Sequence, residues 1–77
     1  MKKKFNFLIE ILSRNKKVSF YLYNVKYIIY ISNNKYIIKQ NNSDYLYTYD
    51  DINKLFTEFK IYGSSIIESL EDLIIVE

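Results

Sequence analysis

The side chains that most enzymes use for acid–base, nucleophilic or metal chemistry are scarce in this sequence. It contains no histidine and no cysteine, so it offers no imidazole that titrates near neutral pH, no thiolate nucleophile and no common zinc ligand. Its single glycine excludes a glycine-rich phosphate-binding loop. The sequence therefore predicts a protein that is not an enzyme and that holds no cofactor and no metal.

Two pairs of neighbouring oxygen-bearing residues remain, and each has a structural explanation. Asp50 and Asp51 are hard-cation ligands by type, but they stand at the start of a predicted helix, where carboxylates interact favourably with the helix dipole. Ser64 and Ser65 have no base nearby in the sequence, and Ser65 suits the cap of a helix. We therefore interpret neither pair as an active site.

A first candidate binding surface is a basic, tyrosine-bearing face of a predicted sheet. Lysines interleaved with tyrosines favour single-stranded nucleic acid, because aromatic rings stack on bases while ammonium groups contact phosphates. Ile28 and Ile37, in the middle of the same face, favour a protein interface, and plain packing or exposure is the third interpretation. The candidate partner-binding residues of this face are Tyr21, Tyr23, Lys26, Tyr30, Lys35 and Lys39.

A second candidate surface is acidic and belongs to the C-terminal half. Residues 1–42 carry nine Lys or Arg against Glu10 alone, a net charge of +8, whereas residues 43–77 carry eight carboxylates against two lysines, a net charge of −6. Clustered carboxylates could occupy a basic groove that normally holds nucleic acid, although a solvated helix surface gives the same pattern. The candidate partner-binding residues are Asp50, Asp51, Glu58, Glu68, Glu71 and Asp72, with Asp44 and Glu77 in the same acidic half.

Hydrophobic periodicity indicates which segments would position these surfaces. Residues 5–13 space their apolar side chains at helical intervals and are followed by Arg14, Lys16 and Lys17, which predicts an N-terminal helix. Residues 18–40 alternate as strands do, with predicted tight turns at Asn24 and Val25 and at Asn33 and Asn34. Residues 45–49 predict a fourth strand.

The two predicted turns place the same apolar side chains on one face of the sheet, which we expect to be the core face. The expected cross-strand pairs are Val18–Ile31, Phe20–Ile29, Leu22–Tyr27, Ile31–Tyr36 and Ile29–Ile38. The opposite face then carries Ser19, Tyr21, Tyr23, Lys26, Ile28, Tyr30, Ser32, Lys35, Ile37 and Lys39. Agreement between two separate turns is the strongest structural signal in the sequence.

The C-terminal half predicts two helices. Thr48 and Asp51 have the spacing of a capping box before an apolar stripe over residues 52–59, and Gly63 is expected to end that helix. Ser65 and Glu68 form a second capping box that opens a second helix. The tail "LIIVE" either completes this helix or pairs as an edge strand.

The sequence as a whole predicts one α+β domain over residues 1–77. It consists of an N-terminal helix, a three- to four-stranded antiparallel sheet and two C-terminal helices that cover the apolar sheet face. No segment has the length of a membrane span, and the opening "MKKKFNFLIEIL" lacks a cleavage site, so we expect a soluble cytoplasmic protein. Abundant Lys, Asn, Ile, Tyr and Phe are typical of an AT-rich genome, which accounts for part of the tyrosine content.

The size of the chain, its helix–sheet–helix–helix order and its acidic final helices resemble small phage-encoded anti-CRISPR inhibitors. One compact αβ member of that group blocks a Cas nuclease by placing acidic side chains where DNA would dock. The resemblance implies a stoichiometric inhibitor of a host nucleic-acid-targeting defence complex, such as a CRISPR effector nuclease. Because this chain is slightly basic overall, with a net charge of +2, its basic half would contact guide RNA or an acidic patch of the effector. The alternatives are a small nucleic-acid-binding regulator and a homodimeric accessory protein.

Overall fold

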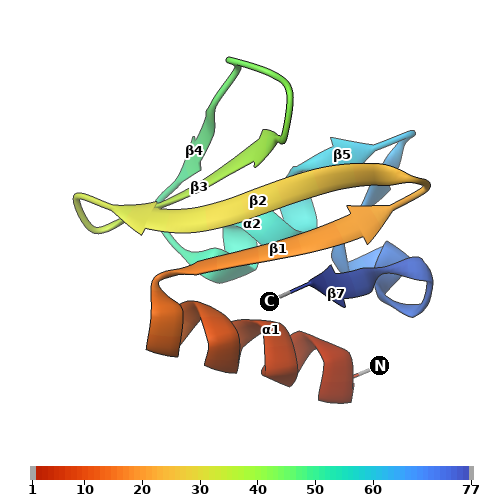
Figure 1. Cartoon of the computed structure of the whole chain (residues 1–77), viewed down its shortest axis with the longest axis horizontal. Coiled ribbons are helices and arrows are strands. Elements are labelled where there is room, and N and C mark those ends of the chain that lie inside the picture. Colours follow the sequence, from red (N-terminus) through yellow and green to blue (C-terminus); the bar gives the residue numbers. More distant parts are fainter. Residues whose placement is uncertain (1, 77) are drawn as a thin grey trace.

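An N-terminal helix leads into a five-stranded antiparallel sheet in this computed structural model, which describes residues 2–76 (Figure 1). The helix is α1 (Lys2–Asn15), and the strand order in the sheet is β4-β3-β2-β1-β7. These strands are β1 (Lys17–Leu22), β2 (Val25–Ser32), β3 (Lys35–Gln40), β4 (Tyr47–Tyr49) and β7 (Ile74–Val76). The remaining elements are α2 (Ile52–Glu58), the hairpin of β5 (Lys60–Ile61) and β6 (Ser64–Ser65), and the 3-10 helix η1 (Ile67–Asp72). The predicted α+β class is confirmed, with more strands than expected.

The N-terminal helix is confirmed and is held at both of its ends. Leu8, Ile11 and Leu12 form its buried stripe. It ends at Asn15, and the next residue, Lys16, has a left-handed φ of 63° and donates its backbone N–H to the Leu12 carbonyl at 2.8 Å. Near its start, the Lys4 ammonium donates to the backbone carbonyl of Leu73 at 2.8 Å. This hydrogen bond connects α1 to the segment just before β7.

The hairpin turns of the sheet are of the type that needs two consecutive residues with positive φ. Asn33 and Asn34, at 52° and 63°, form the predicted β2–β3 turn, and the expected pairing of Ile29 with Ile38 is confirmed. The β1–β2 turn lies one residue earlier than predicted, at Tyr23 and Asn24.

The earlier turn changes the β1–β2 register without changing its faces. Val18 lies opposite Ile29 and Phe20 opposite Tyr27, so the predicted pairing was wrong by two residues. Because side chains alternate along a strand, a slip of two residues keeps every side chain on its predicted face. The predicted division into a core face and an outer face therefore holds.

The core lies between the sheet and the two helices. Phe20, Ile29 and Ile38 are fully buried at the centre of the sheet. The Phe5 ring of α1 meets the Phe56 ring of α2 edge-on, with centroids 5.0 Å apart. Buried residues of α1 and α2 belong to the same cluster as the buried residues of β1, β2 and β3, so both helices cover the same face of the sheet. In Figure 1, α2 lies behind the sheet and α1 below β1, and no helix covers the middle of the face turned toward the viewer.

The N-cap of the first C-terminal helix lies three residues later than predicted. Thr48 pairs with Ile37 inside β4, so it is not a cap. Asp51 is the N-cap of α2 instead, since its carboxylate accepts a hydrogen bond of 2.8 Å from the backbone N–H of Lys54. The predicted apolar stripe is confirmed, with Leu55 and Phe56 buried.

The glycine has a different role from the one predicted. The helix α2 ends before Phe59, whose backbone is extended, so Gly63 does not terminate it. Gly63 (φ +83°) and Tyr62 (φ 52°) form the two-residue turn between β5 and β6. A glycine accepts this left-handed conformation without the strain that a Cβ atom brings.

The second C-terminal helix is a short 3-10 helix. Its predicted capping box is confirmed: Glu68 accepts from the Ser65 backbone N–H at 2.9 Å, and Ser65 Oγ accepts from the Glu68 N–H at 3.3 Å. The residues that follow form β7, which pairs antiparallel with β1. The tail therefore pairs as an edge strand and does not complete the helix. Its apolar, β-branched residues cover the edge of β1, which would otherwise be free. No helix within residues 2–76 is long and apolar enough to cross a membrane.

Candidate interaction surfaces

The outer face of the sheet is the first candidate surface, and we call it the lysine face. It is formed by side chains of β1, β2 and β3 that point away from both helices, with contributions from the neighbouring strands. Its members are Lys17, Ser19, Tyr21, Lys26, Ile28, Tyr30, Ser32, Lys35, Ile37, Lys39, Thr48, Ile74 and Val76. Five of the six residues predicted for the sheet surface are therefore together on this face.

The sixth predicted residue, Tyr23, lies apart from them. It occupies the β1–β2 turn, and its ring contacts the Tyr62 ring with centroids 5.7 Å apart. It therefore borders the end of the sheet rather than its outer face.

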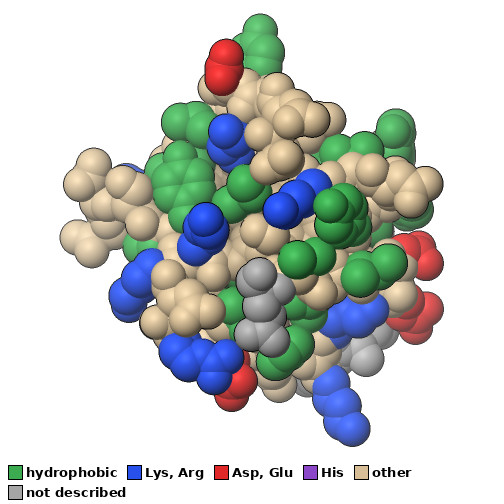
Figure 2. Space-filling view, viewed as in Figure 1, with side chains coloured by type: hydrophobic (Ala, Val, Ile, Leu, Met, Phe, Trp, Pro, Cys, Tyr) green, Lys and Arg blue, Asp and Glu red, His purple; other side chains and the backbone are tan. Residues whose placement is uncertain are grey.

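The lysine face has an apolar centre with lysines around it. Ile28 lies opposite Lys39, and Tyr30 lies opposite Ile37, so the two half-buried isoleucines sit on adjacent strands. Lys26 pairs across the strands with Tyr21, at the end of the face toward the first turn. Figure 2 shows Lys and Arg side chains interleaved with hydrophobic ones over this view, with carboxylates at its margin.

One of the lysines is neutralised by an acidic neighbour. Lys35 forms an ion pair with Asp50, in which both side chains remain exposed. The hydrogen bond from Lys35, together with its charge, lowers the pKa of the Asp50 carboxyl below its ordinary value. Within residues 2–76 this is the one ion pair closer than 4.0 Å, so the ammonium groups of Lys26 and Lys39 are not neutralised in this way.

Three of the six predicted acidic residues have partners within the fold. Asp50 pairs with Lys35, and Asp51 caps α2. Glu68 accepts hydrogen bonds from the backbone and hydroxyl of Ser65, which lower the pKa of its carboxyl, and the nearby charge of Lys60 acts in the same direction. These three carboxylates therefore stabilise local structure within the fold.

The other three acidic residues are exposed and belong to two elements. Glu58 is the last residue of α2, whereas Glu71 and Asp72 end η1. Asp72 borders a hollow that it shares with Tyr21 and Tyr23. No group of three or more carboxylates within residues 2–76 is placed to hold a metal ion, and Glu77 lies outside the described residues.

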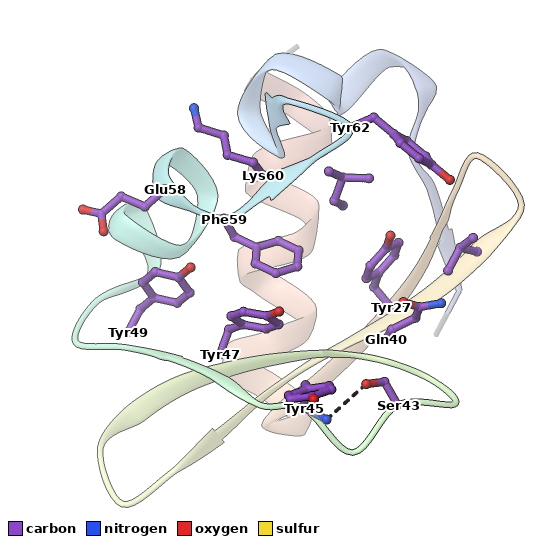
Figure 3. Close-up of a pocket in the computed structure, with 12 residues that line it drawn as sticks. Tyr27, Gln40, Ser43, Tyr45, Tyr47, Tyr49, Glu58, Phe59, Lys60 and Tyr62 are labelled. Atoms are coloured by element: carbon purple, nitrogen blue, oxygen red, sulfur yellow. Dashed lines mark hydrogen bonds between the residues drawn. The ribbon is translucent and has the colours of Figure 1, made fainter.

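A third surface was not predicted: a cleft on the helix side of the sheet, which we call the tyrosine cleft. It has a volume of about 500 Å³ and lies between residues 40–49 and the β5–β6 hairpin. Figure 3 shows Tyr27, Tyr47 and Phe59 around its middle, with Tyr45 and Tyr62 at opposite ends. The aromatic side chains that line it are Tyr27, Tyr45, Tyr47, Tyr49, Phe59 and Tyr62.

A signal for this cleft exists in the sequence. The segment "YLYTY" places Tyr45, Tyr47 and Tyr49 at alternate positions, so that an extended chain directs all three to one side. The other aromatic lining residues come from β2 and from the segment after α2. Their approach depends on tertiary packing, which the alternation does not reveal.

The rings of the cleft pack against one another, and the hydroxyl groups of Tyr27 and Tyr49 have a raised pKa. Phe59 meets Tyr47 at 5.0 Å and Tyr27 at 6.3 Å between ring centroids, both in edge-type geometry. Burial, reinforced by nearby Tyr62, raises the pKa of the Tyr27 hydroxyl. Burial also raises the pKa of Tyr49, followed by the effects of Glu58 and Tyr47. At neutral pH these phenols therefore both donate and accept hydrogen bonds.

No protein family, curated protein or solved structure matches this chain. Its function must therefore be argued from its own surfaces.

Proposed function

We propose that this chain is a non-catalytic binding protein that covers a surface of a partner protein with its lysine face. The observation that carries the proposal is the position of Ile28 and Ile37 at the centre of a sheet face that neither helix covers. An apolar centre with a charged rim is the usual anatomy of a protein interface. The ammonium groups of Lys26 and Lys39, which form no ion pair within residues 2–76, suit a partner whose contact surface is apolar in the middle and acidic around it.

The partner in this proposal is a nucleic-acid-targeting defence complex, such as a CRISPR effector nuclease. The support is the resemblance of the small αβ architecture to anti-CRISPR inhibitors, together with two surfaces of opposite charge. The lysine face would occupy an acidic patch or guide-RNA phosphates of the complex. The exposed carboxylates Glu71 and Asp72 would face a neighbouring basic region. Inhibition would then be stoichiometric and require no chemistry.

A titration of a purified effector nuclease with this protein tests the proposal. Cleavage of target DNA should stop at a fixed molar ratio, and Lys26→Glu or Lys39→Glu should raise the concentration needed. Lys54→Glu is the matched control, because Lys54 is an exposed lysine on α2, which packs on the other side of the sheet. Equal potency of all three variants would remove the lysine face from the mechanism. A lack of inhibition would remove that nuclease as the partner.

A second candidate, binding of single-stranded nucleic acid, is favoured by two cross-strand pairs. Lys17 lies opposite Tyr30, and Lys26 lies opposite Tyr21, so two ammonium groups each neighbour a ring that could stack on a base. Labelled single strands should then change mobility at low salt, and the affinity should fall steeply as salt rises. Tight nuclease binding without such a shift would favour the protein partner.

A further inference from the structure

The tyrosine cleft lies on the opposite side of the sheet from the lysine face, so it is a separate site. Tyr47 and Tyr49 of β4 pair with Ile38 and Tyr36, whose side chains point toward the helices. The cleft therefore opens on the helix side. A ligand there would not compete directly with a partner on the lysine face.

Aromatic side chains are six of the twelve residues that line this cleft. Tyr45 and Tyr62, at its two ends, are 77% and 81% exposed, whereas Tyr27 is only 7% exposed. One accessible ring therefore lies at each end of the cleft, with the buried ring of Tyr27 between them (Figure 3). Aromatic faces carry partial negative charge and attract cations that lose their hydration easily.

Two charged side chains of opposite sign, Glu58 and Lys60, line the cleft. Figure 3 shows both the Lys60 ammonium group and the Glu58 carboxylate directed away from the rings, and the charge of Lys60 acts on Glu68. Glu58, at the outer edge beside Tyr49, forms no ion pair with any residue of the part of the chain that the structure describes. The exposed Asp44 belongs to the loop that carries Tyr45. Because the charges of Glu58 and Lys60 offset each other in the lining, the ring faces, and not a net charge, favour a cation here.

We propose that the tyrosine cleft binds a guanidinium group, that is, an arginine side chain of a peptide or protein. A guanidinium is planar and weakly hydrated, stacks on aromatic rings and presents five N–H donors. The cleft offers phenol oxygens, the Gln40 amide and the Glu58 carboxylate as acceptors. A lysine ammonium is more strongly hydrated, and the partly negative ring faces do not attract a nucleotide phosphate, so both should bind more weakly.

Titrations of the whole protein, followed by NMR signals of the tyrosine rings at low ionic strength, test this proposal. The probes are N-acetyl-arginine methylamide, N-acetyl-lysine methylamide and adenosine monophosphate. The arginine probe should shift the signals of Tyr47, Tyr49 and Tyr62 in a saturable way and bind more tightly than either other probe. The site is refuted if adenosine monophosphate binds more tightly, or if these signals do not move up to the solubility limit of the arginine probe.

Matched variants separate charge from ring stacking. Glu58→Gln should weaken arginine binding about 2- to 5-fold, the range of an exposed ion pair, whereas Glu71→Gln, an exposed carboxylate on η1, should leave it unchanged. Tyr62→Leu should weaken it about 2- to 5-fold through the loss of a cation–π contact, whereas Tyr21→Leu on the lysine face should not. Unchanged affinity in both Glu58→Gln and Tyr62→Leu would overturn the assignment.

Discussion

Glu68 and Ser65 hydrogen-bond to each other at the start of the 3-10 helix η1. The Glu68 carboxylate accepts from the Ser65 backbone N–H at 2.9 Å and from its hydroxyl at 3.0 Å. The Ser65 hydroxyl in turn accepts from the Glu68 N–H at 3.3 Å. Because η1 has only six residues, these contacts are a large part of what fixes the chain between β6 and β7.

This relationship predicts a pH dependence of stability. The pKa of Glu68 is lower in the folded protein than its ordinary value of 4.5, so folding favours the ionised form. Its contribution to the free energy of unfolding is therefore complete above pH 4.5 and is lost as the pH falls through the folded pKa. Urea unfolding between pH 7 and pH 3 should show a smaller loss of stability in Glu68→Gln than in the wild type. Glu71→Gln, the same change on the same helix, should retain the wild-type profile; if it matches Glu68→Gln, the contact is not the cause.

The β5–β6 turn predicts that a side chain at Gly63 destabilises the protein through backbone strain alone. A Cβ atom at Gly63 would meet no heavy atom within 4 Å, so the penalty of Gly63→Ala arises from the φ of +83° alone. We expect a loss of about 1–2 kcal/mol in the free energy of unfolding, measured by urea denaturation. Gly63→Asn should lose less, because asparagine tolerates the left-handed region. Equal stability of Gly63→Ala and the wild type would contradict this turn geometry.

The contact between Phe5 and Phe56 predicts an energetic link between the two helices. Phe56→Ala should cost about 3–5 kcal/mol, because its ring is fully buried, and Phe5→Ala should cost less, because Phe5 is only partly buried. The double variant should cost about 0.5–1.5 kcal/mol less than the sum of the single variants. Additive losses in urea unfolding would show that the rings do not interact.

The faces of the sheet could be predicted from sequence because they depend on parity alone. The strand residues Phe20 and Ile38 alternate with Tyr21 and Ile37, and a turn misplaced by one residue shifts the pairing by two, so each side chain stays on its face. The exact β1–β2 register was missed because the turn uses Tyr23 at positive φ, where asparagine or glycine is expected.

The C-terminal half was less predictable because local signals there compete with tertiary pairing. Thr48 has the type and spacing of a cap, but its backbone is used by the ladder with Ile37. The tail after Leu73 forms a strand because β1 has a free edge beside it, which helical periodicity cannot reveal. The tyrosine cleft was missed because Tyr27, Tyr47 and Phe59 meet there from three separate segments, and the alternation of residues 45–49 predicts a strand alone.

Adjacent isoleucines on β3 give a sharp test of the two sheet faces and of the proposed interface. Ile38 is fully buried, so Ile38→Ala should cost about 2–5 kcal/mol in the free energy of unfolding. Ile37 points to the lysine face and is half-buried, so Ile37→Ala should cost about 1 kcal/mol or less and leave the fold intact.

Binding of the partner should be more sensitive to Ile37→Ala than to Ile38→Ala, the reverse of their effects on stability. In the folded protein, Ile37→Ala removes part of the apolar centre of the lysine face and should weaken the partner complex about 5- to 10-fold, roughly 1 kcal/mol. Thr57→Ala, an exposed change on α2, should not affect binding. Calorimetry on variants first shown to be folded measures the loss of binding separately from the loss of stability. If Ile37→Ala binds as tightly as the wild type, the centre of the lysine face is not a contact surface, because the truncated side chain is the one that a partner there must cover.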